Sequence, residues 1–134
     1  MLNPKSEYRN SKQYRNNEIQ NPKRYDLEER CFEFAKAVRN YLKKLPKTLS
    51  NIEYARQLIR SAGSVGANYI EANEALGKKD FLMRIKISRK EAKESIFWLR
   101  LIEPIKEEEK QQIDLIQEAN ELMKIFGSIY HKSK

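Results

Sequence analysis

The sequence predicts an all-α protein: an antiparallel up-down-up-down four-helix bundle with a disordered or loosely ordered N-terminal tail. Apolar residues recur at intervals of three and four along most of the chain, which places them on one face of a helix. The 134 residues include four glycines and four prolines, and Pro22, Pro46 and Pro104 fall between the periodic segments. The intervening connections are short, so consecutive helices are expected to lie antiparallel.

This length suits one domain, which we divide into a basic, Asn-rich tail (residues 1–25) and the bundle (residues 26–132). The tail has too few aliphatic residues to bury a core. It repeats a tyrosine beside an arginine, at Arg9 and at Arg15. Tyrosines that stack on bases and arginines that pair with phosphates suit single-stranded RNA. The alternative is a tail without a binding role.

The first helix is predicted over residues 26–45, with acidic residues at its start, lysines at its end and Pro46 terminating it. Cys31 belongs to its apolar stripe, so we interpret it as a small buried hydrophobe rather than a nucleophile. A single cysteine forms no internal disulfide, and the sequence shows no secretory signal or long apolar run. These features favour a cytoplasmic location. The stripe comprises Leu27, Cys31, Phe34, Ala35, Val38, Tyr41, Leu42 and Leu45.

The second helix is predicted to start at a Ser50 cap and to close at Gly77 in the left-handed conformation, with Asp80 capping the next helix. Gly63 and Gly66 lie within it, and each costs about 1 kcal/mol relative to alanine. The low bulk around them predicts a close approach of a neighbouring helix, and a flexible hinge is the alternative. The inward face comprises Ile52, Ala55, Leu58, Ile59, Ala62, Val65, Gly66, Tyr69, Asn73 and Leu76.

The third helix, over residues 81–103, presents three kinds of surface when its residues are projected at helical spacing. The core stripe comprises Phe81, Ile85, Ser88, Ala92, Ser95, Ile96 and Leu99. A basic group comprises Lys86, Arg89, Lys90, Lys93 and Arg100. A second apolar strip comprises Met83, Ile87, Phe97, Trp98 and Leu101. A four-helix core cannot also bury this strip, so it predicts an oligomer interface. The alternative is that Trp98 packs inside its own bundle.

The fourth helix is predicted from Lys106 or Glu107 to about Tyr130, with acidic residues in its first turn. Its stripe comprises Ile113, Ile116, Ala119, Leu122, Met123, Phe126, Ile129 and Tyr130.

The net charge of +8 is unevenly distributed, since residues 78–100 carry eight basic and three acidic side chains. Such a concentration attracts polyanions, nucleic acid first. The alternative is that these residues form solvated faces that serve solubility.

The residue patterns of the common catalytic and metal sites are absent. The sole histidine, His131, has no cysteine or histidine partners, and no Glu-x-x-His, P-loop or nucleophile-elbow motif occurs. Four carboxylates of the hairpin are expected to form ion pairs rather than to act in acid–base catalysis; they are Glu71, Glu74, Glu91 and Glu94. We therefore expect no enzyme activity, cofactor, metal, small-molecule substrate or membrane.

The strings RQLIRSAGSV (56–65), ANYIEA (67–72), DF (80–81) and KEAKESIFWL (90–99) resemble the four-helix-bundle proteins encoded in intervening sequences of 23S ribosomal RNA genes. The resemblance spans the chain from about Phe32 to the last helix. It implies an antiparallel four-helix bundle, a ring-like homopentamer and no known catalytic activity. A related branch comprises accessory proteins of diversity-generating retroelements, which bind nucleic acid and a reverse transcriptase. This chain departs from the family pattern at Ala72, where many members have glycine, and in its long basic tail.

Three functions remain open. The first is a noncatalytic oligomer that binds RNA or DNA through the tail and the basic group of the third helix. The second is an interaction scaffold for an acidic partner or a reverse-transcriptase-type complex, without direct nucleic-acid binding. The third, a bundle enzyme or metal carrier, is disfavoured because its motifs are missing.

Overall fold

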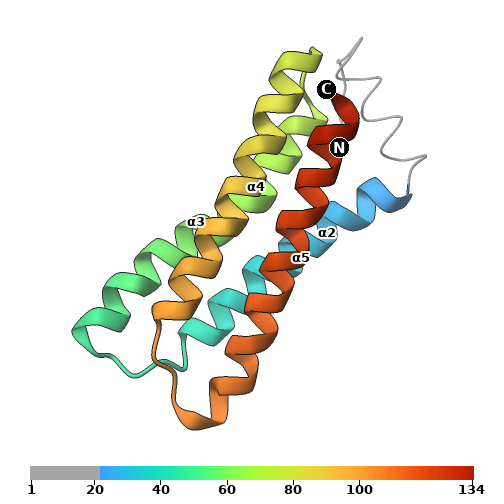
Figure 1. Cartoon of the computed structure of the whole chain (residues 1–134). Coiled ribbons are helices and arrows are strands. Elements are labelled where there is room, and N and C mark those ends of the chain that lie inside the picture. The colour runs from blue at the N-terminus through green and yellow to red at the C-terminus, as the bar shows by residue number, and fades with distance from the viewer. Residues whose placement is uncertain (1–21) are drawn as a thin grey trace.

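The computed structural model describes the backbone of residues 22–134 and the side chains of residues 26–134. This part of the chain forms the helices α2 (Pro22–Leu42), α3 (Leu49–Asn73), α4 (Lys78–Leu101) and α5 (Glu109–Ser133), with a short 3-10 helix, η1 (Lys106–Glu108), before α5. Successive helices run in opposite directions (Figure 1), which confirms the predicted up-down-up-down bundle. Of the predicted tail, Arg9 and Arg15 lie outside the described residues.

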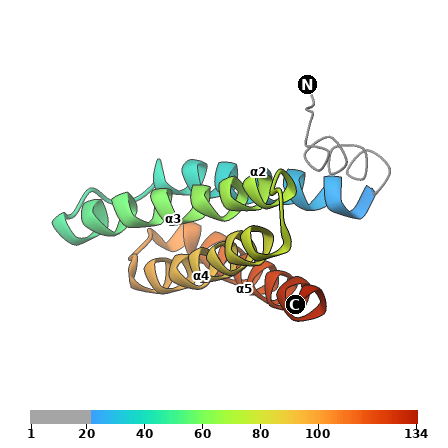
Figure 2. The same ribbon diagram turned by 90° about the horizontal axis from the view of Figure 1, so that it is seen from above.

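The helices form two layers, α2 beside α3 and α4 beside α5 (Figure 2). The most extensive packing joins α3 to α4 and α4 to α5, while α2 packs against α3 and, less extensively, against α5. Because α4 has a neighbour on each flank and the core beneath it, one face of α4 points away from the bundle. That face carries the basic group and the second apolar strip.

The predicted apolar stripes meet in a single core, except that Ile113 of the α5 stripe is exposed and Leu115, which the prediction left out, is buried. Tyr69 of α3 contacts Phe126 of α5 edge to face, with ring centres 5.4 Å apart. The predicted stripe of α4 is buried at Ile85, Ser88, Ala92, Ser95 and Leu99. The face predicted for α3 was too broad, because Ile52, Ile59 and Leu76 are exposed.

The start and end of α2 differ from the prediction. The helix begins at Pro22 rather than at Asp26. A proline suits the first helical turn, where its missing N–H has no helical acceptor and its fixed φ is already helical. The helix ends at Leu42 rather than Leu45, and tighter bonds follow, such as that from the Leu45 N–H to the Leu42 carbonyl at 3.3 Å. The residue before Pro46 is sterically disfavoured in the α conformation, so the helix unwinds ahead of it.

Three predicted caps were wrong. Thr48 caps α3 in place of Ser50, and its side chain accepts a hydrogen bond from the Asn51 N–H at 3.2 Å. Gly77 does not close α3, which ends at Asn73; it precedes α4 with an extended backbone, φ −150° and ψ 168°. Asp80 lies within the first turn of α4 rather than capping it. Its charge still interacts favourably with the positive end of the helix dipole.

The close approach predicted for the glycines of α3 is confirmed at Gly66 and wrong at Gly63. A Cβ atom at Gly66 would lie 2.9 Å from the Cβ of Cys31 in α2, whereas one at Gly63 would have nothing within 4 Å. Cys31 itself is buried, and burial raises the pKa of its thiol to about 12. Such a thiol stays protonated, which agrees with the interpretation of Cys31 as a packing residue.

Polar side chains form hydrogen bonds between the helices and the loops that join them. The hydroxyls of Ser61 and Ser95 lie 2.9 Å apart in the core between α3 and α4, and the Ser88 hydroxyl donates to the Val65 carbonyl at 2.8 Å. At one end of the bundle the buried Asn51 side chain bonds to the backbones of both chain reversals. Its amide donates to the Pro46 and Glu103 carbonyls, and its oxygen accepts from the Glu103 N–H. These contacts fix the register of α3 against α4.

Among the described helices, none combines the length and apolar character that crossing a bilayer requires.

Candidate nucleic-acid and assembly surfaces

The basic face of α4 consists of the five predicted cations, all of them exposed: Lys86, Arg89, Lys90, Lys93 and Arg100. Within residues 26–134, none of the five forms an ion pair or a hydrogen bond to a carboxylate. A cation whose charge is not neutralised by its own protein is free to neutralise a phosphate. Lys90 interacts electrostatically with Glu94 one turn away, but no carboxylate of the described residues pairs directly with any of the five, so the basic face keeps an excess of positive charge.

Two of these cations lie against α5. The Lys86 ammonium is 5.8 Å from the centre of the Tyr130 ring. The Arg89 side chain lies beside Gly127 of α5, where a Cβ would be at an ordinary contact distance of 3.5 Å from Nε. The helix α5 continues through Gly127 to Ser133.

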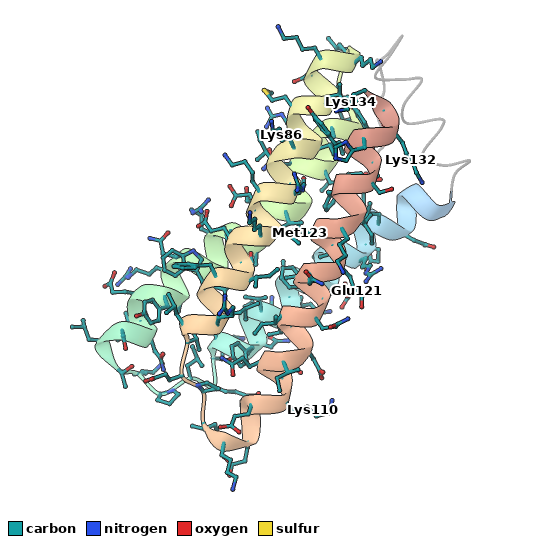
Figure 3. The ribbon with its side chains drawn as sticks, viewed as in Figure 1. Lys86, Lys110, Glu121, Met123, Lys132 and Lys134 are labelled. Atoms are coloured by element: carbon teal, nitrogen blue, oxygen red, sulfur yellow. The ribbon has the colours of Figure 1, made fainter. Side chains whose placement is uncertain are left out.

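The structure adds the C-terminal end of α5 to the basic face, which sequence reasoning missed. The Lys134 ammonium is also 5.8 Å from the Tyr130 ring centre. Figure 3 shows Lys86 and Lys134 at the same end of the bundle, with Lys132 nearby. The sequence signal was the pair Lys132 and Lys134, in the last turn of α5 and directly after it, but only the antiparallel packing of α4 and α5 shows that they lie at the same end as Lys86.

Two other arginines of the bundle, Arg30 and Arg60, form ion pairs between helices. Arg30 of α2 forms a bidentate pair with Glu118 of α5, at 2.7 and 2.8 Å, and reaches Glu121 at 2.6 Å. Arg60 of α3 pairs with Glu94 at 2.7 Å and with Glu91 at 3.5 Å, both on α4. These pairs join neighbouring helices, and they leave the basic face of α4 without partners.

The prediction that the hairpin carboxylates form ion pairs is confirmed for Glu91 and Glu94. The Trp98 indole N–H donates to Glu94 at 2.9 Å, and this bond and the Arg60 guanidinium lower the pKa of the Glu94 carboxyl. A general acid that works at neutral pH needs the opposite shift. Glu94 therefore serves the packing of α4 on α3.

The predicted interface strip of α4 is largely exposed. The exposed fractions are 48% for Met83, 54% for Phe97 and 39% for Leu101, and Ile87 is half-buried. Trp98 differs, because its ring packs against Tyr54 of α3 with centres 6.0 Å apart and is partly buried. In the single chain, Trp98 therefore packs within its own bundle, as the alternative interpretation expected.

The described residues contain no group of three histidine, cysteine or acidic side chains arranged to hold a metal ion. His131 contacts Tyr130 edge to face, with ring centres 5.7 Å apart.

The described residues form an all-α four-helix bundle in which α4 turns exposed cations and apolar side chains outward. Residues 23–128 match the family described as 23S rRNA-intervening sequence protein, and the chain belongs to that family.

A solved structure supports this placement. A protein of unknown function from the S23 ribosomal protein family of Bacteroides thetaiotaomicron VPI-5482 is similar at 30% identity and a TM-score of 0.71. The similarity covers 81% of this chain and 98% of that one. No curated protein matches the sequence.

Proposed function

We propose that this protein is a noncatalytic homo-oligomer that binds RNA or DNA through the basic face of α4. The observation that carries the proposal is that five exposed cations on one helix form no direct ion pair with a carboxylate among the described residues. Nucleic-acid binding driven by phosphates needs this kind of uncompensated positive surface. We include two further pairs in the proposed binding surface: Lys132 and Lys134 at the end of α5, and Arg9 and Arg15 of the tail. A cytoplasmic location, where both the protein and nucleic acid would be present, completes the proposal.

Self-association is the second part of the proposal. Met83, Phe97 and Leu101 place exposed apolar area on a helix whose opposite side is already buried. Apolar patches of this kind mark interfaces between proteins. The proposed subunit number, five, rests on the family resemblance alone.

The nucleic-acid proposal is tested by filter retention of single-stranded RNA and of duplex DNA at low salt. Reversing three charges of the basic face, Lys86→Glu, Lys90→Glu and Lys93→Glu, is expected to weaken retention by at least about tenfold, since several phosphate contacts are lost together. A matched control reverses three exposed lysines elsewhere: Lys43→Glu, Lys47→Glu and Lys106→Glu. Equal losses in both variants, or no retention of either nucleic acid by the wild type, would contradict the proposal.

The alternative function is a scaffold for an acidic partner protein. It is favoured by one observation, the exposed apolar residues that interleave with the cations on α4, because mixed apolar and charged surface is typical of protein interfaces. Nucleic acid that copurifies with the protein, seen as raised absorbance near ~260 nm, distinguishes the first function from the second.

A further inference from the structure

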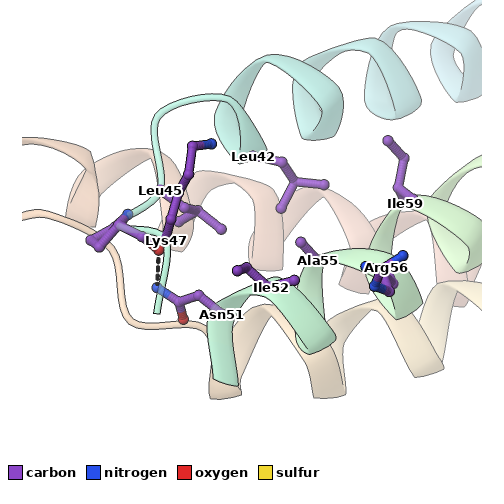
Figure 4. A pocket seen from close by; sticks show the side chains of 9 residues that line it. Leu42, Leu45, Lys47, Asn51, Ile52, Ala55, Arg56 and Ile59 are labelled. Carbon is purple, nitrogen blue, oxygen red and sulfur yellow. Dashed lines mark hydrogen bonds between the residues drawn. The ribbon is translucent and has the colours of Figure 1, made fainter. Parts of the chain in front are cut away.

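A depression of about 290 Å³ opens where the chain passes from α2 to α3 (Figure 4). It lies in the layer of α2 and α3, apart from the layer of α4 and α5 (Figure 2). Its volume is close to the lower limit of about 300 Å³ for pockets that hold small molecules. The lining comes from the end of α2, the following loop and the first turns of α3; it comprises Leu42, Leu45, Pro46, Lys47, Asn51, Ile52, Ala55, Arg56 and Ile59.

Most of this lining is aliphatic, and it continues from the core to the surface. Leu45 is buried, and Leu42 and Ala55 are half-buried. Ile52 is exposed by 39% and Ile59 by 50%. An alkyl chain in the depression would remove these two isoleucines from water and would itself leave water, and both changes favour binding. The depression therefore suits a ligand with an apolar body.

The neutral polar side chain of the lining, Asn51, is already hydrogen-bonded within the protein. Its amide nitrogen donates to the Pro46 carbonyl at 3.1 Å and to the Glu103 carbonyl at 2.9 Å, and its oxygen accepts from the Glu103 N–H at 3.0 Å. Because these groups have partners, an apolar ligand beside Asn51 leaves no polar group unsatisfied. The same bonds hold the loop after α2 against α3, so the shape of the depression exists before a ligand binds.

The charged side chains of the lining are both cations, Lys47 from the loop and Arg56 from α3 (Figure 4). Among the nine described residues that line the depression, none is acidic. Lys47 forms no ion pair within residues 26–134. The Arg56 Nε lies 4.0 Å from Glu53 Oε2, and these side chains are 72% and 63% exposed, so the pair is loose. Both cations are therefore available to an anionic group, and the planar guanidinium of an arginine matches a carboxylate in shape.

We propose that the depression between α2 and α3 binds a single-chain amphiphile with a carboxylate head, the chemistry of a medium-chain fatty acid. The aliphatic lining takes the alkyl chain, and Lys47 and Arg56 attract the carboxylate. The volume suits one short chain rather than the two long acyl chains of a membrane phospholipid. This site is separate from the basic face of α4, so it does not depend on the proposed binding of nucleic acid.

The test titrates decanoate into the wild-type protein by calorimetry, without nucleic acid and below the concentration at which decanoate forms micelles. Two matched probes separate the chain from the head group. Octanoate is shorter by two methylenes and is expected to bind at least about tenfold more weakly, since each buried methylene changes affinity roughly fourfold. Decyltrimethylammonium has a ten-carbon chain and the opposite charge, and it is expected to bind at least about tenfold more weakly, because its head meets two cations.

Variants then assign the two parts of the ligand to residues. Lys47→Gln combined with Arg56→Gln is expected to weaken decanoate binding about fivefold without weakening that of decyltrimethylammonium. Ile59→Asn is expected to weaken decanoate binding while the preference for a carboxylate remains. Lys43→Gln and Ile113→Asn change an exposed lysine and an exposed isoleucine outside the lining, and they are expected to keep the wild-type affinity. All five positions are exposed, so the fold is expected to survive, as circular dichroism would report.

Amide chemical shifts locate the bound ligand. Decanoate is expected to shift the resonances of Leu42, Ala55 and Ile59. Shifts centred on Phe97 and Leu101 would place the ligand on the apolar strip of α4 and would overturn the proposal. Equal affinities for decanoate and decyltrimethylammonium would also overturn it, because the two cations would then not select the head group. So would the absence of decanoate binding, even if vesicles of phosphatidylglycerol bind the protein.

Discussion

Two glycines in one helix have opposite roles at the scale of single residues. Gly66 permits the contact between α2 and α3 at Cys31, and Gly63 faces open space within the chain. The sequence predicted a close approach for both, because both lie in the same run of small side chains. Only the position of α2 distinguishes them, and that position depends on residues far from either glycine.

The two glycines give a matched pair of substitutions. Gly66→Ala is expected to destabilise the fold, because overpacking costs about 1–3 kcal/mol and exceeds the roughly 1 kcal/mol gained in helix propensity. Gly63→Ala is expected to stabilise it by up to about 1 kcal/mol, since nothing obstructs the added methyl. Urea unfolding at one protein concentration measures both. A Gly66→Ala variant at least as stable as Gly63→Ala would contradict the close contact.

At the scale of elements, the helices could be predicted and their ends could not. The spacing of apolar residues is a local property, so every buried residue of α4 belongs to the predicted stripe, although Phe81 and Ile96 of that stripe are only partly buried. The caps depend on the loop geometry that the whole bundle imposes, and Ser50, Gly77 and Asp80 were assigned roles that the chain does not use. The broad face of α3 was also misread, because periodicity cannot tell which of its apolar residues meet α2.

Ion pairs between elements predict how stability depends on pH. The pKa of the Glu94 carboxyl is lowered by the Trp98 indole and Arg60, and that of Glu121 by Gln117 and Arg30. A carboxyl whose pKa is lower in the folded state stabilises the fold above its unfolded pKa of about 4.3, and loses that effect as the pH falls further. Stability is therefore expected to fall on acidification below about pH 4.3.

The contribution of Glu94 is measured with a neutral replacement. Glu94→Gln keeps the shape but no longer titrates, so the difference in urea midpoint between neutral and acidic buffer is expected to shrink. Glu109→Gln alters an exposed carboxylate for which no partner is seen among the described residues and serves as the control. An acid dependence unchanged by Glu94→Gln would show that this pair does not couple stability to pH.

At the scale of the whole molecule, two outward surfaces account for the proposed function. The charge clustering on α4 was visible in the sequence, because all five cations lie on a single helix. The addition of Lys134 was not, since it lies beside Lys86 only when α4 and α5 are packed together. Antiparallel packing of α4 and α5 brings the two lysines to the same end of the bundle, and a local sequence pattern does not predict this proximity.

The central claim is that the cations of α4 contact phosphates directly. The most direct test is the slope of the logarithm of RNA affinity against the logarithm of salt concentration, for the wild type and for single alanine variants of Lys86 and Lys93. Each lost phosphate contact is expected to reduce the slope by about 1, and Lys43→Ala is expected to leave it unchanged. Slopes that are the same for all four proteins would contradict the account.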